Sequence, residues 1–397
     1  MGILEKIFIV FIFLFPAGEL LRIQFANGLA VSLNDIGLFL VVSVWLIYKL
    51  KNRKTKNNYL LLAPLALFMS IGIISLILNF PNLGINNFLV SFSYYVRYLG
   101  YLFLYFLVKD FSLKYKSKLK LYLLLSGLIM LLIGYVQFFF YPSLKAWFPY
   151  GWDEHLYRMF STFLDPNFSG AFYSLYFIYV IDYLRKIHKK QVELKEILLG
   201  AVALLSLIAV YLTYSRSALI MLIVSVLTYL FILKKRKLIF VSLTVLILLI
   251  FVSPRAFSTE GTNLLRTVSS FERIQSVEVA AKIISQNPIL GVGFNAYRYA
   301  QNRNGLNNKI WQVTHSGAGT DTSLLFVIAT TGIIGFLAYL FLIYKIFYLA
   351  FKNLKGTGIM LFSVFLGLLF NSLFINSLFF VFILEWIWII SGLTENN

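Results

Sequence analysis

Apolar segments long enough to approach the width of a membrane recur along this chain, and they constrain its fold more than any other feature. An α-helix needs roughly 20 apolar residues to cross the hydrocarbon core of a bilayer. Twelve segments approach that length, and they lie at about 5–24, 35–50, 59–79, 89–108, 121–140, 166–184, 197–213, 217–233, 238–253, 322–349, 357–373 and 375–391. Because 60% of the residues are hydrophobic and only 13% are charged, the composition is also that of a polytopic membrane protein. We therefore predict an all-α fold of about 12 transmembrane helices that form a single integral membrane domain, residues 1–397.

The basic residues predict which ends of these helices face the cytoplasm. Lys and Arg cluster after alternate predicted spans, in the segments 49–56, 109–120, 185–195, 234–237 and 345–355. The positive-inside rule assigns such clusters to the cytoplasm. Both termini are then cytoplasmic, which agrees with an even number of spans, and we expect a multi-pass protein of the cytoplasmic (inner) membrane. No small-residue cleavage site precedes a soluble domain, so we expect the first apolar segment to be retained as a helix rather than removed as a signal peptide.

The basic residues on the other side of the membrane are of a different kind. Twenty of the 23 Lys and Arg residues assigned to the cytoplasm are Lys, whereas nine of the other 12 are Arg. A guanidinium group can bind phosphate or carboxylate through two parallel hydrogen bonds. We therefore expect the outer, periplasmic or extracellular, face to bind an anion, and the net charge of +19 requires no nucleic-acid partner.

Three outer segments, 141–165, 214–216 and 254–321, hold most of the sequence that is not predicted to lie in lipid. The last of them is the longest. Within it, the spacing of Ser269 and Glu272 fits a capping box, and apolar residues then recur with a helical period. We predict a short amphipathic helix from about 270 to 286, which ends before Pro288 because the residue before a proline disfavours the α conformation.

Two arginines lie in or beside predicted spans, where a charge is costly unless it faces a cavity or a partner. Arg97 is in the middle of a span, so we interpret it as a substrate-binding residue; carbonyl groups of a broken helix are the structural alternative. Arg216 lies at the outer mouth of two spans. Its side chain could also extend to the interface without any functional role.

The segment RMFSTFLDPN (158–167) combines a structural and a functional signal. Asp165 and Pro166 fit a helix N-cap and the first helical position, whereas Arg158 has no such structural duty and is the better candidate for binding.

The segment 314–335 also combines two signals. Thr320 or Asp321 can cap the helix that follows, and Gly332 and Gly335 can allow close helix packing. His315 has no such role, so it is either a solvated loop residue or a base for proton transfer near neutral pH.

These segments together resemble the O-antigen polymerase and ligase family of integral membrane glycosyltransferases. The resemblance lies in four motifs in the same order along the chain: R-x-x-S-T-F-L-D-P-N (158–167), YSRSAL (214–219), FER with NPILGVGF (271–294), and a polar segment that leads into the TGIIG helix (331–335). Ligase-type members carry His-Asn twelve residues before the helix glycine, counted inclusively, where this chain has Asp321-Thr322. Because an acidic residue there is similar to polymerase-type members, the resemblance favours a polymerase.

The resemblance implies a reaction on polyprenyl-diphosphate-linked glycans at the outer face of the membrane. Arg158, Arg216 and Arg273 match family positions and would neutralise the diphosphate leaving group. Asp321 or His315 would take the proton of the acceptor hydroxyl. The further candidates for substrate binding are Arg97, Arg298, Asn167 and Trp311.

The sequence also indicates what such a site lacks. The chain has no cysteine, so neither disulfides nor a cysteine nucleophile are expected. No cluster of carboxylates or histidines with metal-ligand spacing occurs in the outer loops, so we expect no metal and no cofactor. The expected partners are the lipid-linked glycan, the bilayer and a candidate protein that sets chain length.

Two alternatives remain open at this stage. A ligase of the same family would transfer a finished glycan to lipid A core or to a protein. A flippase for the same lipid-linked glycan belongs to another class, and such transporters usually show repeated halves and polar residues at mid-membrane depth. The polar residues predicted here gather on one face instead.

Overall fold

The computed structural model describes residues 2–25, 28–52, 58–188, 193–242, 244, 260–264, 268–306 and 319–395, and most of them are helical, as predicted. The α-helices are α1 (Gly2–Leu14), α2 (Leu33–Lys51), α3 (Leu62–Leu78), α4 (Phe80–Asp110), α5 (Leu113–Phe140), α6 (Pro166–Ile187), α7 (Leu194–Leu212), α8 (Arg216–Ile232), α10 (Val268–Gln286), α11 (Tyr297–Arg303), α12 (Ser323–Lys352), α13 (Gly358–Asn371) and α14 (Val381–Thr394). Short 3₁₀ helices are η1 (Phe15–Ala17), η3 (Lys145–Tyr150), η4 (Ser161–Phe163), η5 (Glu260–Thr262) and η7 (Ser377–Phe379), and the strands β1 (Arg22–Gln24) and β2 (Ala30–Ser32) form one antiparallel pair.

The expected count of 12 spans is not confirmed. Among the described helices, α2, α5, α7 and α12 are long and apolar enough to cross a membrane, and a fifth span results if α3 and α4, which meet at a bend of 118°, are taken together. The helices α8, α13 and α14 are apolar but shorter. Most of the expected ninth span, 238–253, lies outside the described residues.

The expected first span, 5–24, is wrong in its second half. Helix α1 ends at Leu14, because Pro16 enters a 3₁₀ turn and Gly18 takes a positive φ of 54°. The chain then forms strand β1 from Arg22. Gly18 packs so closely on η4 that an added Cβ would lie 2.5 Å from the carbonyl oxygen of Thr162. The N-terminal hairpin is therefore held against the loop 141–165.

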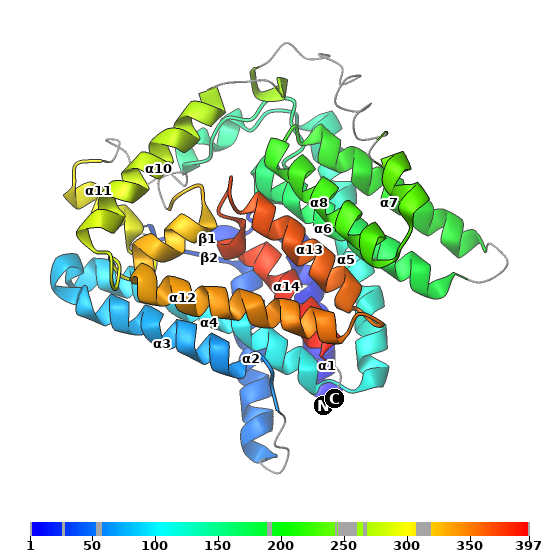
Figure 1. Cartoon of the computed structure of the whole chain (residues 1–397), viewed down its shortest axis with the longest axis horizontal. Coiled ribbons are helices and arrows are strands. Elements are labelled where there is room, and N and C mark those ends of the chain that lie inside the picture. Colours follow the sequence, from blue (N-terminus) through cyan, green and yellow to red (C-terminus); the bar gives the residue numbers. More distant parts are fainter. Residues whose placement is uncertain are drawn as a thin grey trace.

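The centre of the bundle is α14, which packs against α4 and is buried along most of its length (Figure 1). Its Trp386 is fully buried and contacts the rings of Phe15 and Phe172. Around this centre, α6 packs on α7 and α8, α8 on α13, and α12 on α3. At the periphery, α7 exposes large apolar side chains such as Leu194 and Leu204, which suits a helix that faces lipid.

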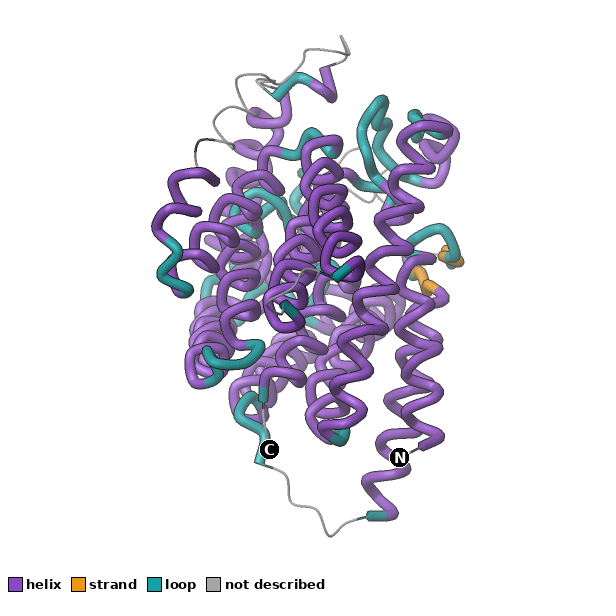
Figure 2. Tube along the Cα trace, turned by 90° about the vertical axis from the view of Figure 1, so that its right-hand side faces the viewer, coloured by secondary structure: helices purple, strands orange, loops and turns teal. Residues whose placement is uncertain are grey.

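The two ends of the bundle differ in composition. Both termini lie at the same end of the bundle, and loops gather at the opposite end (Figure 2), where Figure 1 places α10. Lysines converge at the terminal end, where Lys109 forms an ion pair with Glu395 and Lys49 one of 2.8 Å with Asp110. We call this the lysine-rich end and the other the loop-rich end. That the lysine-rich end is cytoplasmic stays a prediction.

Helix α12 is broken at Gly332, and the turn after α10 fills the break. Gly332 has φ 66° and ψ −170°, a conformation open almost only to glycine. The N–H groups of Val292 and Gly293 donate to the carbonyls of Ala329 and Thr330, and the N–H of Ile333 donates to Pro288. The backbone groups freed by the break are thus satisfied inside the protein, as a break at membrane depth requires.

Helix α10 ends at Gln286, before Asn287-Pro288, as predicted. It begins at Val268, however, so Ser269 lies within the helix and cannot be its N-cap. The predicted capping box is therefore wrong, whereas the helix that it suggested is present.

Candidate functional site

Arg158 is fixed at a junction of three segments at the loop-rich end. Its side chain is buried, and its Nε donates to the carbonyl oxygen of Thr213 at 2.9 Å, in the turn between α7 and α8. Its Nη2 donates to Oδ1 of Asn167 at 3.4 Å, in the first turn of α6. The backbone is tied at the same place, because the N–H of Met159 donates to the carbonyl of Leu212 at 2.9 Å.

Backbone strain gathers around this junction. Four residues other than glycine have positive φ angles, namely Tyr157 (57°), Ser161 (49°), Leu164 (56°) and Tyr214 (49°). Each such conformation costs on the order of 1–3 kcal/mol and persists only where the surroundings enforce it. Strain of this kind is typical of sites at which a side chain must be held in one position.

Two helices begin beside Arg158. Asp165 is the N-cap of α6, as predicted, and accepts from the N–H groups of Asn167 and Phe168. Ser215 caps α8 and donates through its hydroxyl to Oδ1 of Asn167 at 2.9 Å. Arg216 is therefore the first residue of α8. Helix N-termini carry partial positive charge, so this junction favours an anion.

The charges of Arg273 in α10 and of Asp321, just before α12, influence each other. Burial lowers the pKa of Arg273; the carboxylate of Asp321 opposes that shift, whereas the positive charge of Arg216 adds to it. Burial raises the pKa of Asp321, and Arg273 opposes that shift. The guanidinium of Arg273 also packs over the ring of Phe374 at 5.8 Å.

Asp321 does not cap α12. The N-cap of that helix is Thr322, and its side chain makes no capping hydrogen bond. The Thr320 hydroxyl donates instead to the carbonyl of Thr322 at 2.6 Å. The predicted capping role of Thr320 or Asp321 is therefore wrong, and the Asp321 side chain lies among charged groups.

Asp153 is a member of this site that the sequence analysis missed. Loss of solvent around its side chain and the negative charges of Asp165, Glu272 and Asp321 raise its pKa to about 6. Asp153 nevertheless keeps part of its surface open to solvent, so it can exchange a proton with solvent or with a bound molecule. Its only signal in the sequence was an acidic pair in an otherwise aromatic outer loop.

Together these residues form the first arginine group, which consists of Arg158, Arg216 and Arg273 with the four carboxylates Asp153, Asp165, Glu272 and Asp321. It combines guanidinium groups that can hold an anion with three aspartates, Asp153, Asp165 and Asp321, whose raised pKa values suit proton transfer. Among the residues that the structure describes, no group of three or more carboxylates or histidines is arranged to hold a metal ion.

Arg97 does not join this group. Its Nε donates to Oδ1 of Asp35 in α2 at 2.7 Å, and the Tyr101 hydroxyl donates to the same oxygen. Asn34 extends the buried network from α2 to Glu385 of α14, to which its Nδ2 donates at 2.6 Å. An arginine within a span needs a cavity or a partner. The buried carboxylate of Asp35 is that partner for Arg97.

Arg298 also lies apart from the first group. Burial lowers the pKa of its guanidinium; Tyr94 and Tyr299 oppose that shift, whereas the charge of Arg22 adds to it. Arg97 packs over the ring of the same Tyr94 at 5.9 Å. We call Arg22, Arg97 and Arg298 the second arginine group. The two remaining candidates, His315 and Trp311, lie outside the described residues.

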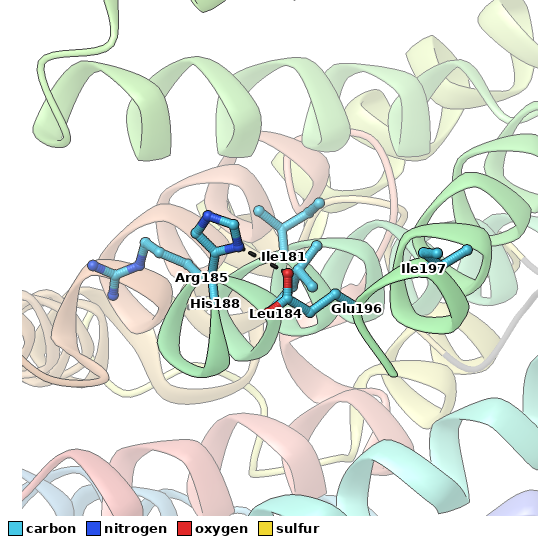
Figure 3. A pocket seen from close by; sticks show the side chains of 6 residues that line it. All are labelled: Ile181, Leu184, Arg185, His188, Glu196 and Ile197. Atoms are coloured by element: carbon cyan, nitrogen blue, oxygen red, sulfur yellow. Dashed lines mark hydrogen bonds and ion pairs between the residues drawn. The ribbon is translucent and has the colours of Figure 1, made fainter. Parts of the chain in front are cut away.

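A cavity of about 430 Å³ opens at the lysine-rich end, between the last turn of α6 and the start of α7 (Figure 3). It is lined by Ile181, Leu184, Arg185, His188, Glu196 and Ile197. His188 and Glu196 are joined there at 2.9 Å. None of the predicted site residues lines this cavity, so the candidate site is the first arginine group.

Comparison with protein families finds a match for one segment of the chain, and this segment contains part of the site. Residues 201–340 match the model of a family described as O-antigen ligase. The matched segment contains Arg216, Arg273 and Asp321, whereas Arg158 and Asp153 precede it. Comparison with curated proteins gives no match. A glycosyltransferase-like membrane enzyme of glycan biosynthesis is consistent with the family and with the apolar helices. Residues 201–340 are therefore similar to the O-antigen ligase family, which supports the resemblance to O-antigen polymerases and ligases for this part of the chain.

Proposed function

We propose that this protein is a polysaccharide polymerase that joins oligosaccharide repeat units, of O-antigen or capsule, carried on polyprenyl diphosphate. The observation that carries the proposal is that Arg158, Arg216 and Arg273 come from separate segments and converge with carboxylates at one end of the bundle. The reaction takes place on the outer face of the cytoplasmic membrane, which is the loop-rich end in our proposal.

In the proposed reaction, a hydroxyl oxygen of the acceptor sugar attacks the anomeric carbon of the donor glycan. A new glycosidic C–O bond forms, the bond from the anomeric carbon to the diphosphate oxygen breaks, and polyprenyl diphosphate leaves with the electron pair. Asp321 accepts the proton of the hydroxyl. A carboxylate whose pKa is raised by burial is a stronger base than an ordinary aspartate.

Arg216 and Arg273 act on the leaving group. Negative charge grows on the diphosphate as its bond to the sugar breaks, so guanidinium groups beside it stabilise the transition state more than the ground state. Arg158 donates hydrogen bonds to the buried Thr213 and to the half-buried Asn167, so it holds the junction together and adds a fixed positive charge. We propose that no metal takes part, and the reaction should then persist in excess EDTA.

The test is the polysaccharide ladder of a deletion strain complemented with Arg216→Lys, Arg273→Lys or Asp321→Asn. We expect the ladder to collapse to a single repeat unit while blots show normal protein levels. Arg303→Lys is the matched control, because Arg303 is an exposed arginine at the same end that donates only to the carbonyl of Asn82 among its described contacts. A normal ladder in all three site variants would contradict the proposal.

A ligase is the second candidate, because the matching family carries that description. The two activities differ in what accumulates when the gene is deleted. Short, unpolymerised repeats on the carrier support the polymerase, and long chains left on the carrier support the ligase. A flippase forms no glycosidic bond, so purified protein that lengthens a lipid-linked glycan excludes it.

A further inference from the structure

The cavity between α6 and α7 at the lysine-rich end takes no part in the proposed reaction. None of the residues that line it belongs to either arginine group. Its volume of about 430 Å³ falls within the range of about 300–1,000 Å³ that is usual for ligand sites. Three of its six lining side chains are apolar and three are polar (Figure 3). One part of the cavity can therefore hold hydrocarbon while another part binds a polar group.

The polar part contains Arg185, in the last turn of α6. Its Nη2 donates to Oδ1 of Asp182 at 2.8 Å, and its Cζ lies 6.0 Å from the ring centroid of Tyr229. These two contacts hold the guanidinium group in place. Its Nε is buried, and no hydrogen-bond partner for this atom occurs in the part of the chain that the structure describes. A buried donor without a partner costs roughly 1–3 kcal/mol, so this N–H favours a ligand that brings an acceptor.

His188, directly after α6, offers a second polar group. Its Nδ1 lies 2.9 Å from Oε2 of Glu196 in the first turn of α7, so the two side chains join the helices across the cavity (Figure 3). Because a carboxylate can only accept, Nδ1 donates, and Nε2 is the acceptor of the neutral ring. The His188 side chain is 60% exposed. Nε2 can thus accept a hydrogen bond from a hydroxyl group of a ligand.

The apolar part of the cavity continues into an exposed apolar face of α7. Ile197 lines the cavity and is itself exposed. Leu194, Leu198, Leu204 and Ile208 are exposed too, and the helical period places them on the same face as Ile197. A hydrocarbon chain that leaves the cavity beside Ile197 can therefore continue along α7. A soluble anion would gain nothing from this apolar surface.

The segment that joins α6 and α7 carries a surplus of positive charge. Residues 182–197 contain five Lys and Arg residues and three Asp and Glu residues. Two of the three acids already have basic or imidazole partners, since Asp182 pairs with two cations and Glu196 contacts His188. A surplus of this sign attracts an anion. Basic pockets between helices on the cytoplasmic side of a membrane are typical sites for anionic lipid headgroups.

We propose that this cavity binds one anionic phospholipid whose headgroup carries a hydroxyl, such as phosphatidylglycerol. Arg185 donates from Nε to a phosphate oxygen, and a headgroup hydroxyl donates to Nε2 of His188. An acyl chain passes Ile197 and continues along α7. The inference does not depend on the proposed polymerase activity.

The lipid would bridge the two helices that hold the Arg158 junction at their opposite ends. Helix α6 begins at Pro166, one residue before Asn167, and α7 ends at Leu212, one residue before Thr213. Arg158 donates to both Asn167 and Thr213. We therefore expect bound phosphatidylglycerol to raise the melting temperature of the whole chain.

The direct test maps lipid contacts on the purified full chain. Protein in phosphatidylcholine nanodiscs receives a phosphatidylglycerol probe with a photoreactive diazirine on its acyl chain, and adducts are located by peptide mass spectrometry. We expect adducts on residues 181–188 and 194–198. Labelling there should be at least tenfold stronger than with a phosphatidylcholine probe, the effect of about one charge-assisted hydrogen bond. Equal labelling by the two probes would overturn the inference.

Two neighbouring basic residues provide a variant and its matched control. Arg185→Lys keeps a charge that can pair with Asp182 but has no Nε, so labelling by the phosphatidylglycerol probe should fall about tenfold. Lys186→Gln removes a whole charge from a residue that pairs with the same Asp182 but does not line the cavity, and it should label like wild type. Unchanged labelling of Arg185→Lys, or an equal loss in Lys186→Gln, would contradict the site.

A second pair of variants leaves every charge in place. Ile197→Trp fills the apolar part of the cavity from an exposed position, so the protein should fold and labelling of 181–188 should disappear. Leu204→Trp, on the same face of α7 but outside the cavity, is the control and should label like wild type. Unchanged labelling of Ile197→Trp would place the lipid on the helix surface and would contradict binding in the cavity.

Competition distinguishes a lipid from a soluble anion. Glycerol phosphate has the phosphate and hydroxyl groups of the headgroup but no hydrocarbon chain, and we expect an excess of it to leave labelling unchanged. Displacement of the probe by equimolar glycerol phosphate would show that the cavity takes a soluble anion, and it would overturn the assignment to a lipid.

Melting temperatures give a second readout that needs no probe and no glycan. Adding phosphatidylglycerol to phosphatidylcholine nanodiscs should raise the melting temperature of wild type and of Lys186→Gln, but not that of Arg185→Lys or Ile197→Trp. An equal rise in all four proteins would contradict a lipid bound in this cavity. Failure of the polymerase proposal would leave both readouts unaffected, because neither measures formation of a glycosidic bond.

Discussion

At the scale of single residues, the role of Arg158 in holding the junction together depends on the shape of its guanidinium group as well as on its charge. Its Nε and Nη2 reach Thr213 and Asn167, two partners that a lysine cannot bind at once. We expect Arg158→Lys to lower the free energy of unfolding by about 2 kcal/mol and to reduce activity at normal abundance. Thermal unfolding of the purified protein measures the first effect. Arg303→Lys is the control. A melting temperature of Arg158→Lys equal to that of wild type would contradict the structural role of Arg158.

Asp153 gives a prediction whose sign depends on pH. Its pKa rises from 3.8 to about 6 on folding, so the folded chain binds the proton more tightly than the unfolded chain. The stability of the fold therefore declines as the pH rises from about 4 to about 6, and it stays lower above that range. Asp153→Asn removes this effect. We expect it to raise the melting temperature at pH 7.5 and to leave it unchanged at pH 4.

The neighbouring carboxylate of Glu154 offers a matched control for this experiment. Glu154→Gln removes one negative charge from the adjacent position, outside the set of carboxylates that raise the pKa of Asp153. We expect its melting temperature to follow the wild-type curve at both pH values. An equal stabilisation by Glu154→Gln at pH 7.5 would mean that net charge, rather than the position of Asp153, is responsible.

The sequence indicates the arginines of the candidate site but not their partners. Arg216 and Arg273 lie in short motifs that local sequence reveals. Asp153 becomes a member of the site only through folding, since the charges around it come from α6, α10 and the segment before α12. The same holds for Arg97, whose partner Asp35 lies 62 residues away on another helix. An acidic pair in a loop does not show which charged groups will lie beside it in the folded protein.

At the scale of secondary-structure elements, the break in α12 depends on Gly332. An added Cβ would lie 2.1 Å from the carbonyl oxygen of Ile289, and the backbone has a conformation that other residues rarely adopt. We expect Gly332→Ala to destabilise the protein by about 3 kcal/mol or more and to reduce its abundance in membranes. Gly200→Ala in α7 is the control, because an added Cβ there meets no atom within 4 Å. Similar abundance of the two variants would contradict this account of the break.

Prolines lie at several of the helix boundaries, and two of these boundaries were predicted from the sequence. Helix α10 ends before Pro288 and α6 begins at Pro166, both as predicted. The end of α1 at Leu14 was not predicted, because the apolar residues that follow it look like a continuing span. Tight packing of Gly18 on Thr162 turns the chain away instead. Such a contact cannot be predicted from composition alone.

At the scale of the whole molecule, the arrangement of the two ends predicts what each side of the membrane can reach. The chain has no cysteine, so single cysteines can be introduced without further changes. We expect a cysteine at Lys145 to react with an impermeant maleimide on intact cells, and a cysteine at Lys355 to react only after the membrane is opened. Labelling of Lys355→Cys on intact cells would reverse the proposed orientation.

Purified protein shows whether the first arginine group catalyses formation of a glycosidic bond between lipid-linked glycans. Wild type, Asp321→Asn and Arg303→Lys are each given the lipid-linked repeat unit, and glycan length and released polyprenyl diphosphate are measured together. We expect wild type and Arg303→Lys to lengthen the glycan with one diphosphate released for each bond. We expect Asp321→Asn to be at least 100-fold slower, on the order of the loss of a general base. Equal rates for Asp321→Asn and wild type, or diphosphate release without a longer glycan, would contradict this catalytic role.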